Sequence, residues 1–151
     1  AFPHSAHRSR LMEDKMNTTQ TTSFGLYRFL QQHFNDVVEQ LRAVLEAAGF
    51  EVITEIDLTK VLERKAQAHL KRHRVFVICH LDLAVAALSI APKSAPFLLC
   101  NVDVYHLDDQ QVEVTITIPL EQSGAQLEPH LQIIAEDMGK RLEHVVHALK
   151  G

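Results

Sequence analysis

The sequence predicts an α+β fold, a two-layer sandwich in which a sheet of about five strands is packed by a long C-terminal helix and shorter helices. Runs with an apolar residue at every second position alternate along the chain with apolar stripes at helical spacing. The 151 residues are 46% hydrophobic and 23% charged, which suits one domain with a sizeable core. We expect this domain to span residues 16–151, and residues 1–15 to be a disordered tail or an addition to the native chain.

A strand and an amphipathic helix are predicted first. Phe24–Leu30 is short and rich in aromatic residues, which favours a strand. Apolar residues then recur at helical spacing over residues 34–48, which indicates a helix opened by Asn35 or Asp36 and closed by Gly49.

Two further strand and helix pairs follow. Phe50–Asp57 has the β-branched content of a second strand, and residues 58–70 suit a shorter, more exposed helix. Val75–Cys79 predicts a third strand. Leu81–Ile90 is rich in Ala and Leu and long for a central strand, so we interpret it as a buried helix ended by Pro92.

Residues 97–107 and 111–118 are predicted to form a hairpin, with Pro96 at the entry to its first strand. Directly opposed residues of an antiparallel pair point to the same face, so the apolar positions of the two strands must match. This match requires a loop of odd length around Asp108–Gln110 and places Cys100 on the core face. The resulting pairs are Val104 with Val114, Val102 with Ile116 and Cys100 with Ile118.

A loop and a long helix end the chain. The loop is expected after Pro119, over residues 120–129, and apolar residues at spacings of three and four from Leu127 to Leu149 predict the helix.

Charge and composition narrow the classes of partner. The formal net charge is −4, and an acidic domain without a dense basic run repels phosphate backbones, so no nucleic-acid partner is expected. No apolar stretch approaches the roughly 20 residues that cross a bilayer, so no membrane contact is expected. Only two cysteines occur, both in apolar surroundings, which favours a reducing cytoplasm.

The sequence contains no nucleotide-binding glycine loop, zinc-protease motif or nucleophile elbow, so it identifies no reaction and no cofactor. Cys79, His80 and Cys100 form the first candidate site, since a thiol beside an imidazole suits redox, sulfur-transfer or metal chemistry. The alternative is plain packing, because free cysteines are often buried. Strand alternation would also point Cys79 and His80 to opposite faces unless the strand has ended.

Glu55 and Asp57 form the second candidate, because residues two apart on a strand share a face. Paired carboxylates can act as acid and base or bind a cation. The alternative is structural, with Asp57 capping the next helix and a carboxylate pairing with Lys65. Two histidine pairs have helical spacing, but both lack a third ligand, so we interpret them as solvent-exposed. They are His69 with His73 and His144 with His147.

Three segments together resemble the domain of unknown function 302 family: GFEVITEIDLTKVLERK (49–65), VICHLDLAVAAL (77–88) and LLCNVDVY (98–105). The resemblance covers residues 24–150. Three positions depart from the family pattern, since His80 stands for Asn, and Leu81 and Leu99 each stand for Pro. The resemblance implies a curved antiparallel sheet, a topology like half of the TATA-binding protein, and a homodimer, but it implies no activity. Matching positions are Gly49, Phe50, Glu55, Ile56, Asp57, Lys65, Cys79, Ala84, Leu88, Cys100, Asn101 and Val102.

Two functional hypotheses follow. The first is a noncatalytic homodimeric domain that binds a small molecule or a metal in a cleft between sheet and helices. The second is a thiol-dependent redox protein, enzyme or sulfur carrier with Cys79 or Cys100 as nucleophile and His80 as base. A purely structural partner domain is a third possibility. The candidate ligand-binding residues are Glu55, Asp57, Lys65, Cys79, His80, Cys100 and Asn101.

Overall fold

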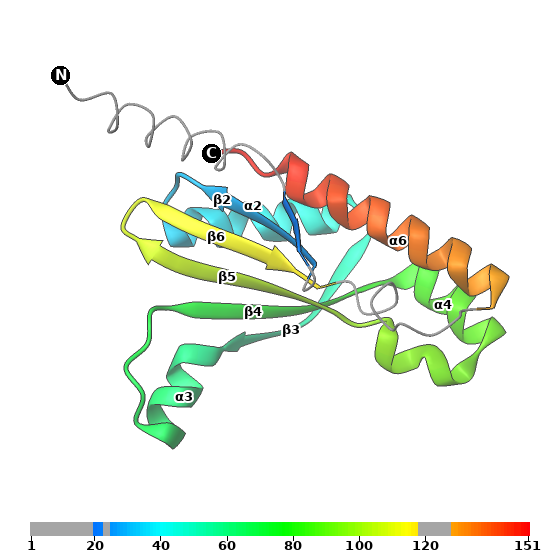
Figure 1. Ribbon diagram of the computed structural model, residues 1–151, viewed down its shortest axis with the longest axis horizontal. Coiled ribbons are helices and arrows are strands. Elements are labelled where there is room, and N and C mark those ends of the chain that lie inside the picture. The colour runs from blue at the N-terminus through cyan, green and yellow to red at the C-terminus, as the bar shows by residue number, and fades with distance from the viewer. Residues whose placement is uncertain (1–19, 23–24, 118–127) are drawn as a thin grey trace.

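The computed structural model describes residues 20–22, 25–117 and 128–151 (Figure 1). The tail expected at residues 1–15, the loop after Pro119 and the apolar position Leu127 lie outside these residues. The elements in chain order are β1 (Gln20–Thr22), β2 (Gly25–Leu30), α2 (Phe34–Ala47), β3 (Phe50–Asp57), α3 (Leu58–Ala66), β4 (His73–His80), α4 (Leu81–Ile90), the 3-10 helix η1 (Pro92–Phe97), β5 (Cys100–Asp108), β6 (Gln111–Ile116) and α6 (Pro129–Ala148).

The described strands form one antiparallel sheet in the order β1-β2-β6-β5-β4-β3. The predicted α+β fold is confirmed. The sheet has one strand that the sequence did not predict, β1, whose three residues are all polar and pair with the start of β2. Within the described part of the chain, every helix falls short of what a bilayer crossing requires.

The core lies between the sheet and two helices, α2 and α6. In Figure 1, β2 and β6 lie in front of α2, so α2 covers the far side of these strands. Every second residue of β6, and of β5 from Cys100 to Val104, is buried against the helices, as the alternation predicts. The predicted stripe of the last helix is also buried. Fully buried core side chains include Phe76, Ile78, Val102, Val104, Val112, Val114, Val37, Leu41, Met138 and Leu142.

The β5–β6 register confirms the predicted pairs Val104 with Val114 and Val102 with Ile116. Ile118, the expected partner of Cys100, lies outside the described residues. The odd-length loop is wrong in its detail. Asp108 pairs with Gln111, which leaves a two-residue turn, and a bulge between His106 and Asp108 supplies the extra residue that keeps the apolar faces aligned.

Two predicted element starts are also wrong. The helix α2 begins at Phe34 after His33, which makes no side-chain cap, whereas Asn35 and Asp36 lie in the first turn. Phe34 is buried, so packing outweighs capping propensity at this position. Pro96 lies inside η1 and does not open a strand, so β5 starts three residues later than expected, at Cys100.

The helix α4 has its predicted bounds but is not buried all round. Leu83, Ala84 and Ala87 face the core, whereas Leu81 and Val85 are exposed. The prediction of a buried helix is therefore wrong for its outer face.

Candidate binding face of the sheet

The two cysteines lie on opposite faces of the sheet. Cys100 is 1% exposed, and its Sγ lies 3.7 Å from the Sδ of Met138. Burial raises the pKa of the Cys100 thiol to about 12. Cys79 follows Ile78 on β4, so strand alternation turns it to the other face, where it is half-buried and still packs against core residues; desolvation raises its pKa as well. Neither thiol has the lowered pKa on which thiolate chemistry depends.

His80 is a buried cap of α4. Its side chain is on the core face, and its Nδ1 accepts a hydrogen bond of 3.3 Å from the backbone N–H of Leu83. The carbonyl of Ala48 accepts a hydrogen bond from the ring, and Nη1 of Arg141 lies 3.4 Å from Nε2. Asn is a preferred N-cap residue, so the cap explains how His can replace the Asn of the family pattern.

Burial and then the charge of Arg141 lower the pKa of His80. The folded state therefore holds a neutral ring, and the unfolded state binds the extra proton as pH falls through about 6.5. His80→Asn keeps a cap and removes this titration. We expect wild type to be more stable by about 1 kcal/mol at pH 7.5, because Asn leaves the Ala48 carbonyl unpaired. In urea unfolding this difference should narrow at pH 5; a difference that does not change with pH would contradict the neutral buried ring.

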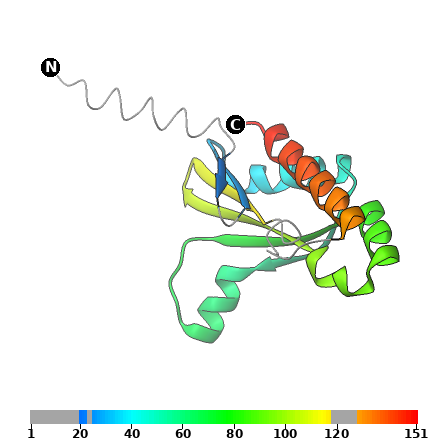
Figure 2. The ribbon, with the colours of Figure 1, turned by 45° about the vertical axis from the view of Figure 1, so that its right-hand side comes forward.

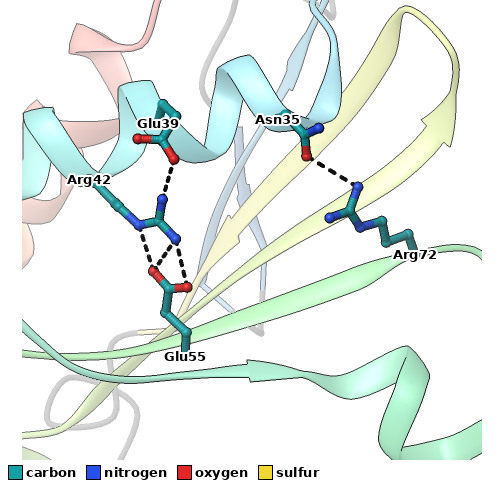
Figure 3. Close-up of polar contacts among 5 residues, drawn as sticks. All are labelled: Asn35, Glu39, Arg42, Glu55 and Arg72. Carbon is teal, nitrogen blue, oxygen red and sulfur yellow. Dashed lines mark hydrogen bonds and ion pairs between the residues drawn. The ribbon is translucent and has the colours of Figure 1, made fainter.

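Glu55 belongs to an ion-pair network between β3 and α2 (Figure 3). Arg42 donates to it through Nε at 2.6 Å and Nη2 at 2.7 Å, and also pairs with Glu39. The hydrogen bond from Arg42 lowers the pKa of Glu55. Beside this network, Arg72 donates to Asn35 at 3.2 Å. The geometry thus ties α2 to the two strands at this edge of the sheet.

Asp57 caps α3 as predicted, because its carboxylate accepts a hydrogen bond of 3.1 Å from the backbone N–H of Lys60. The ion-pair partners of the two strand carboxylates are Arg42 and Lys60 and not Lys65, which is exposed on α3.

The structure does not bring the seven predicted residues together in a cleft between sheet and helices. That layer is the apolar core, which contains Cys100 and His80. A hollow of about 330 Å³ lies between α2 and β3, and Glu55 is the one predicted residue that lines it. Asn101 is exposed on the opposite face of the sheet.

The histidine pairs that have helical spacing in the sequence form no metal site in the part of the chain that the structure describes. There, no three His, Cys, Asp or Glu side chains gather closely enough to hold an ion. His69 lies between α3 and β4 while His73 is on β4, so this pair does not share a helix. His144 and His147 are exposed on α6, as predicted.

A polar cluster that the sequence did not predict lies on the open face of the sheet, the face turned away from α2 and α6. The strand registers place its side chains in two adjacent rows that cross four strands. One row crosses from β2 to β4 through Phe29, Glu113, Tyr105 and His73. The other crosses through Tyr27, Thr115, Asp103 and Val75.

His73 and Asp103 form the centre of this cluster. Nδ1 of His73 lies 2.7 Å from Oδ2 of Asp103, and the His73 ring stacks on Tyr105 with centroids 4.2 Å apart. The hydroxyl of Thr115 donates to Glu113 at 3.3 Å. The second carboxylate oxygen of Asp103, Oδ1, is shielded from solvent and has no hydrogen-bond partner in the described structure.

Both carboxylates of the cluster are difficult to ionise. Desolvation raises the pKa of Asp103 despite the hydrogen bond with His73. Desolvation, with the charge of Asp103 as a smaller cause, raises the pKa of Glu113. Carboxylates whose pKa values are shifted by burial and by a charged neighbour are found more often at functional sites than elsewhere. The polar phase of β5, in which Asn101, Asp103 and Tyr105 alternate with the core residues, is the sequence signal that points to this face.

The antiparallel sheet, with helices on one face and a polar cluster on the other, defines a two-layer α+β domain. The chain belongs to the family described as domain of unknown function DUF302, whose model matches residues 28–149, and the resemblance is confirmed. It is similar to the crystal structure of an uncharacterized conserved protein DUF302 from Bacillus stearothermophilus, with a TM-score of 0.71 and 23% identity over 80% of this chain and 93% of that one. At this identity the likeness shows the fold alone. No curated protein matches the chain.

Proposed function

We propose that the protein is a noncatalytic homodimeric domain that binds a small organic cation, an ammonium compound, on the open face of its sheet. Asp103 and Glu113 would hold the charge, and His73 would orient Asp103. The observation that carries the proposal is the shielded Oδ1 of Asp103, which has no partner in the described structure although it belongs to an ionisable group. A buried acceptor of this kind costs free energy until a donor reaches it.

The chemistry of an ammonium group fits this cluster. Such a group carries one positive charge and up to three N–H donors, which suits the two carboxylates and the hydroxyl of Thr115. Aromatic rings of Tyr105 and Phe29 occupy the positions on either side of Glu113 in its row, where they can attract a cation by their faces. Binding would also lower both raised carboxylate pKa values, so affinity should increase as pH rises through them.

Raised thiol pKa values support a binding role over a thiol-dependent one. Cys79 and Cys100 are both free thiols, which supports the proposal of a reducing, cytoplasmic location.

A titration with n-propylammonium chloride, followed by amide chemical shifts, tests the binding site. We expect the shifts to concentrate on β5 and β6 around Asp103 and Glu113. Asp103→Asn or Glu113→Gln should weaken binding on the order of tenfold, the usual scale for one charge-assisted hydrogen bond. Glu63→Gln is the matched control, because it removes an exposed carboxylate on α3. Equal affinity in all four proteins, or shifts that sodium chloride reproduces, would contradict the proposal.

Asp103→Asn should also raise the thermal stability of the protein at pH 7. A raised carboxylate pKa means that the folded state binds more protons than the unfolded state, so stability falls as pH rises through this range. Asn removes the ionisation and can keep a hydrogen bond with His73. We expect a higher Tm than wild type at pH 7 and no gain at about pH 3, where Asp103 is protonated in both states. A lower Tm at pH 7 would show that the carboxylate stabilises the fold.

A further inference from the structure

The helix α4 exposes an apolar face to solvent. Eight of its ten residues are apolar, and the two polar ones are Asp82 and Ser89. Leu81, Val85 and Leu88 recur at a spacing of four and three, which puts them on one stripe, and all three are exposed. A helix that is apolar on all sides is usually buried on all sides. The core covers the inner side of α4. The outer side is equally apolar, but no described part of the chain packs over it.

Neighbouring elements extend this surface, which we call the α4 face. Phe97 ends η1 and Leu99 lies two residues beyond it, and Ile133 is on the first half of α6, the helix that packs against α4. Figures 1 and 2 both show α4 and the start of α6 together at one end of the sheet. Seven of the ten large apolar side chains that are exposed among the described residues lie on α4, at the end of η1 or on the start of α6, and we count them as the α4 face: Leu81, Val85, Leu88, Ile90, Phe97, Leu99 and Ile133.

The size of the α4 face matches one side of a protein interface. Val85 is 67% exposed and Ile133 64%, and the seven residues together expose on the order of 700 Å² of surface. A stable interface of standard size buries about 800 Å² on each partner. The α4 face therefore needs little additional surface to form such an interface.

We infer that a second copy of this chain covers the α4 face, which makes it the homodimer interface. In a two-fold dimer the same patch meets itself, so one contact removes both apolar surfaces from water. Only Asp82 and Lys93 are charged over residues 81–99, and their opposite charges give no net field that would select a charged partner. The stripe of α4 suits packing against the same stripe of another helix.

This inference rests on the homodimer in the proposed function, and it identifies the surface through which the two copies meet. The helix α4 lies at one end of the sheet (Figure 1), whereas the register places Asp103 and Glu113 within β5 and β6. Dimerisation through the α4 face would leave the open face of the sheet accessible to a ligand.

Sedimentation equilibrium of the full chain and of two matched variants tests the surface. Val85→Glu places a charge at the centre of the α4 face, whereas Ile53→Glu places one at an exposed apolar residue of β3 outside it. We expect wild type and Ile53→Glu to be dimers, and Val85→Glu to dissociate at least about 100-fold more readily, since burying an unpaired charge is costly. If Val85→Glu loses its circular dichroism signal and so fails to fold, Val85→Ser takes its place. We expect this variant to weaken dimerisation by a smaller but measurable factor.

The outcomes separate the two proposals. A dimer that Val85→Glu and Val85→Ser leave unchanged would overturn the α4 face and keep the homodimer. A wild-type monomer would overturn both the homodimer and this inference, because the face would then be free or covered by the same chain. Neither outcome affects the n-propylammonium titration, which tests the open face independently.

Discussion

Cys100 should react with iodoacetamide about a thousandfold more slowly in the folded protein than a thiol of pKa 9.0. The expected factor follows from the pKa of about 12, because alkylation requires the thiolate, and three pKa units reduce its fraction at neutral pH by this amount. The thiol is also 1% exposed beneath α6. The rate is measured by mass spectrometry on Cys79→Ser, in which Cys100 is the one remaining cysteine.

Unfolding in guanidinium should remove this protection. The matched control is Cys100→Ala, in which Cys79 remains alone and should react faster than Cys100, because it is partly exposed. Equal rates for the two cysteines in the native protein would contradict the buried position of Cys100. They would also favour the thiol-dependent hypothesis over the binding one.

Gly49→Ala should destabilise the protein by about 2–3 kcal/mol, measured by urea unfolding. Gly49 follows α2 with φ +86°, a conformation that costs an L-residue energy, and a Cβ there would lie 2.9 Å from Nε2 of His80. The ring cannot move away freely, because it caps α4 and is bonded to the Ala48 carbonyl.

The same substitution in a His80→Asn background separates the two causes. The shorter Asn side chain relieves the contact, so the second Gly49→Ala loss should be smaller and reflect the backbone conformation alone. Equal losses in the two backgrounds would show that the contact with His80 contributes nothing. No loss in either would contradict the backbone conformation at Gly49.

The sequence predicted the elements whose side chains alternate or repeat strongly. The bounds of β3 and α4 agree with the structure, and the β5–β6 pairs followed from matching two apolar phases. The strand β1 was not predicted, because three polar residues have no apolar phase and form a strand only through pairing with β2. The start of α2 depends on the burial of Phe34, which is a tertiary effect.

Less of the candidate site could be predicted, because its contacts join residues that are far apart in the sequence. The core position of Cys100 followed from the alternation of β5. The same alternation places Asp103 on the open face, but the polar positions of this strand gave no sign of their partners on β4 and β6. The partner of Glu55 is Arg42, which the packing of α2 brings close, whereas Lys65 is near in sequence and points elsewhere. Contacts between elements depend on how the elements pack, and spacing along the chain does not determine this.

The central claim is that Asp103 and Glu113 form a cation-binding pair, and their carboxyl carbon-13 shifts measured against pH test it most directly. In the free protein both carboxylates should titrate above their ordinary pKa values, and both pKa values should fall when n-propylammonium is added. Ordinary pKa values for the pair, or raised values that the ammonium ion leaves unchanged, would contradict the account.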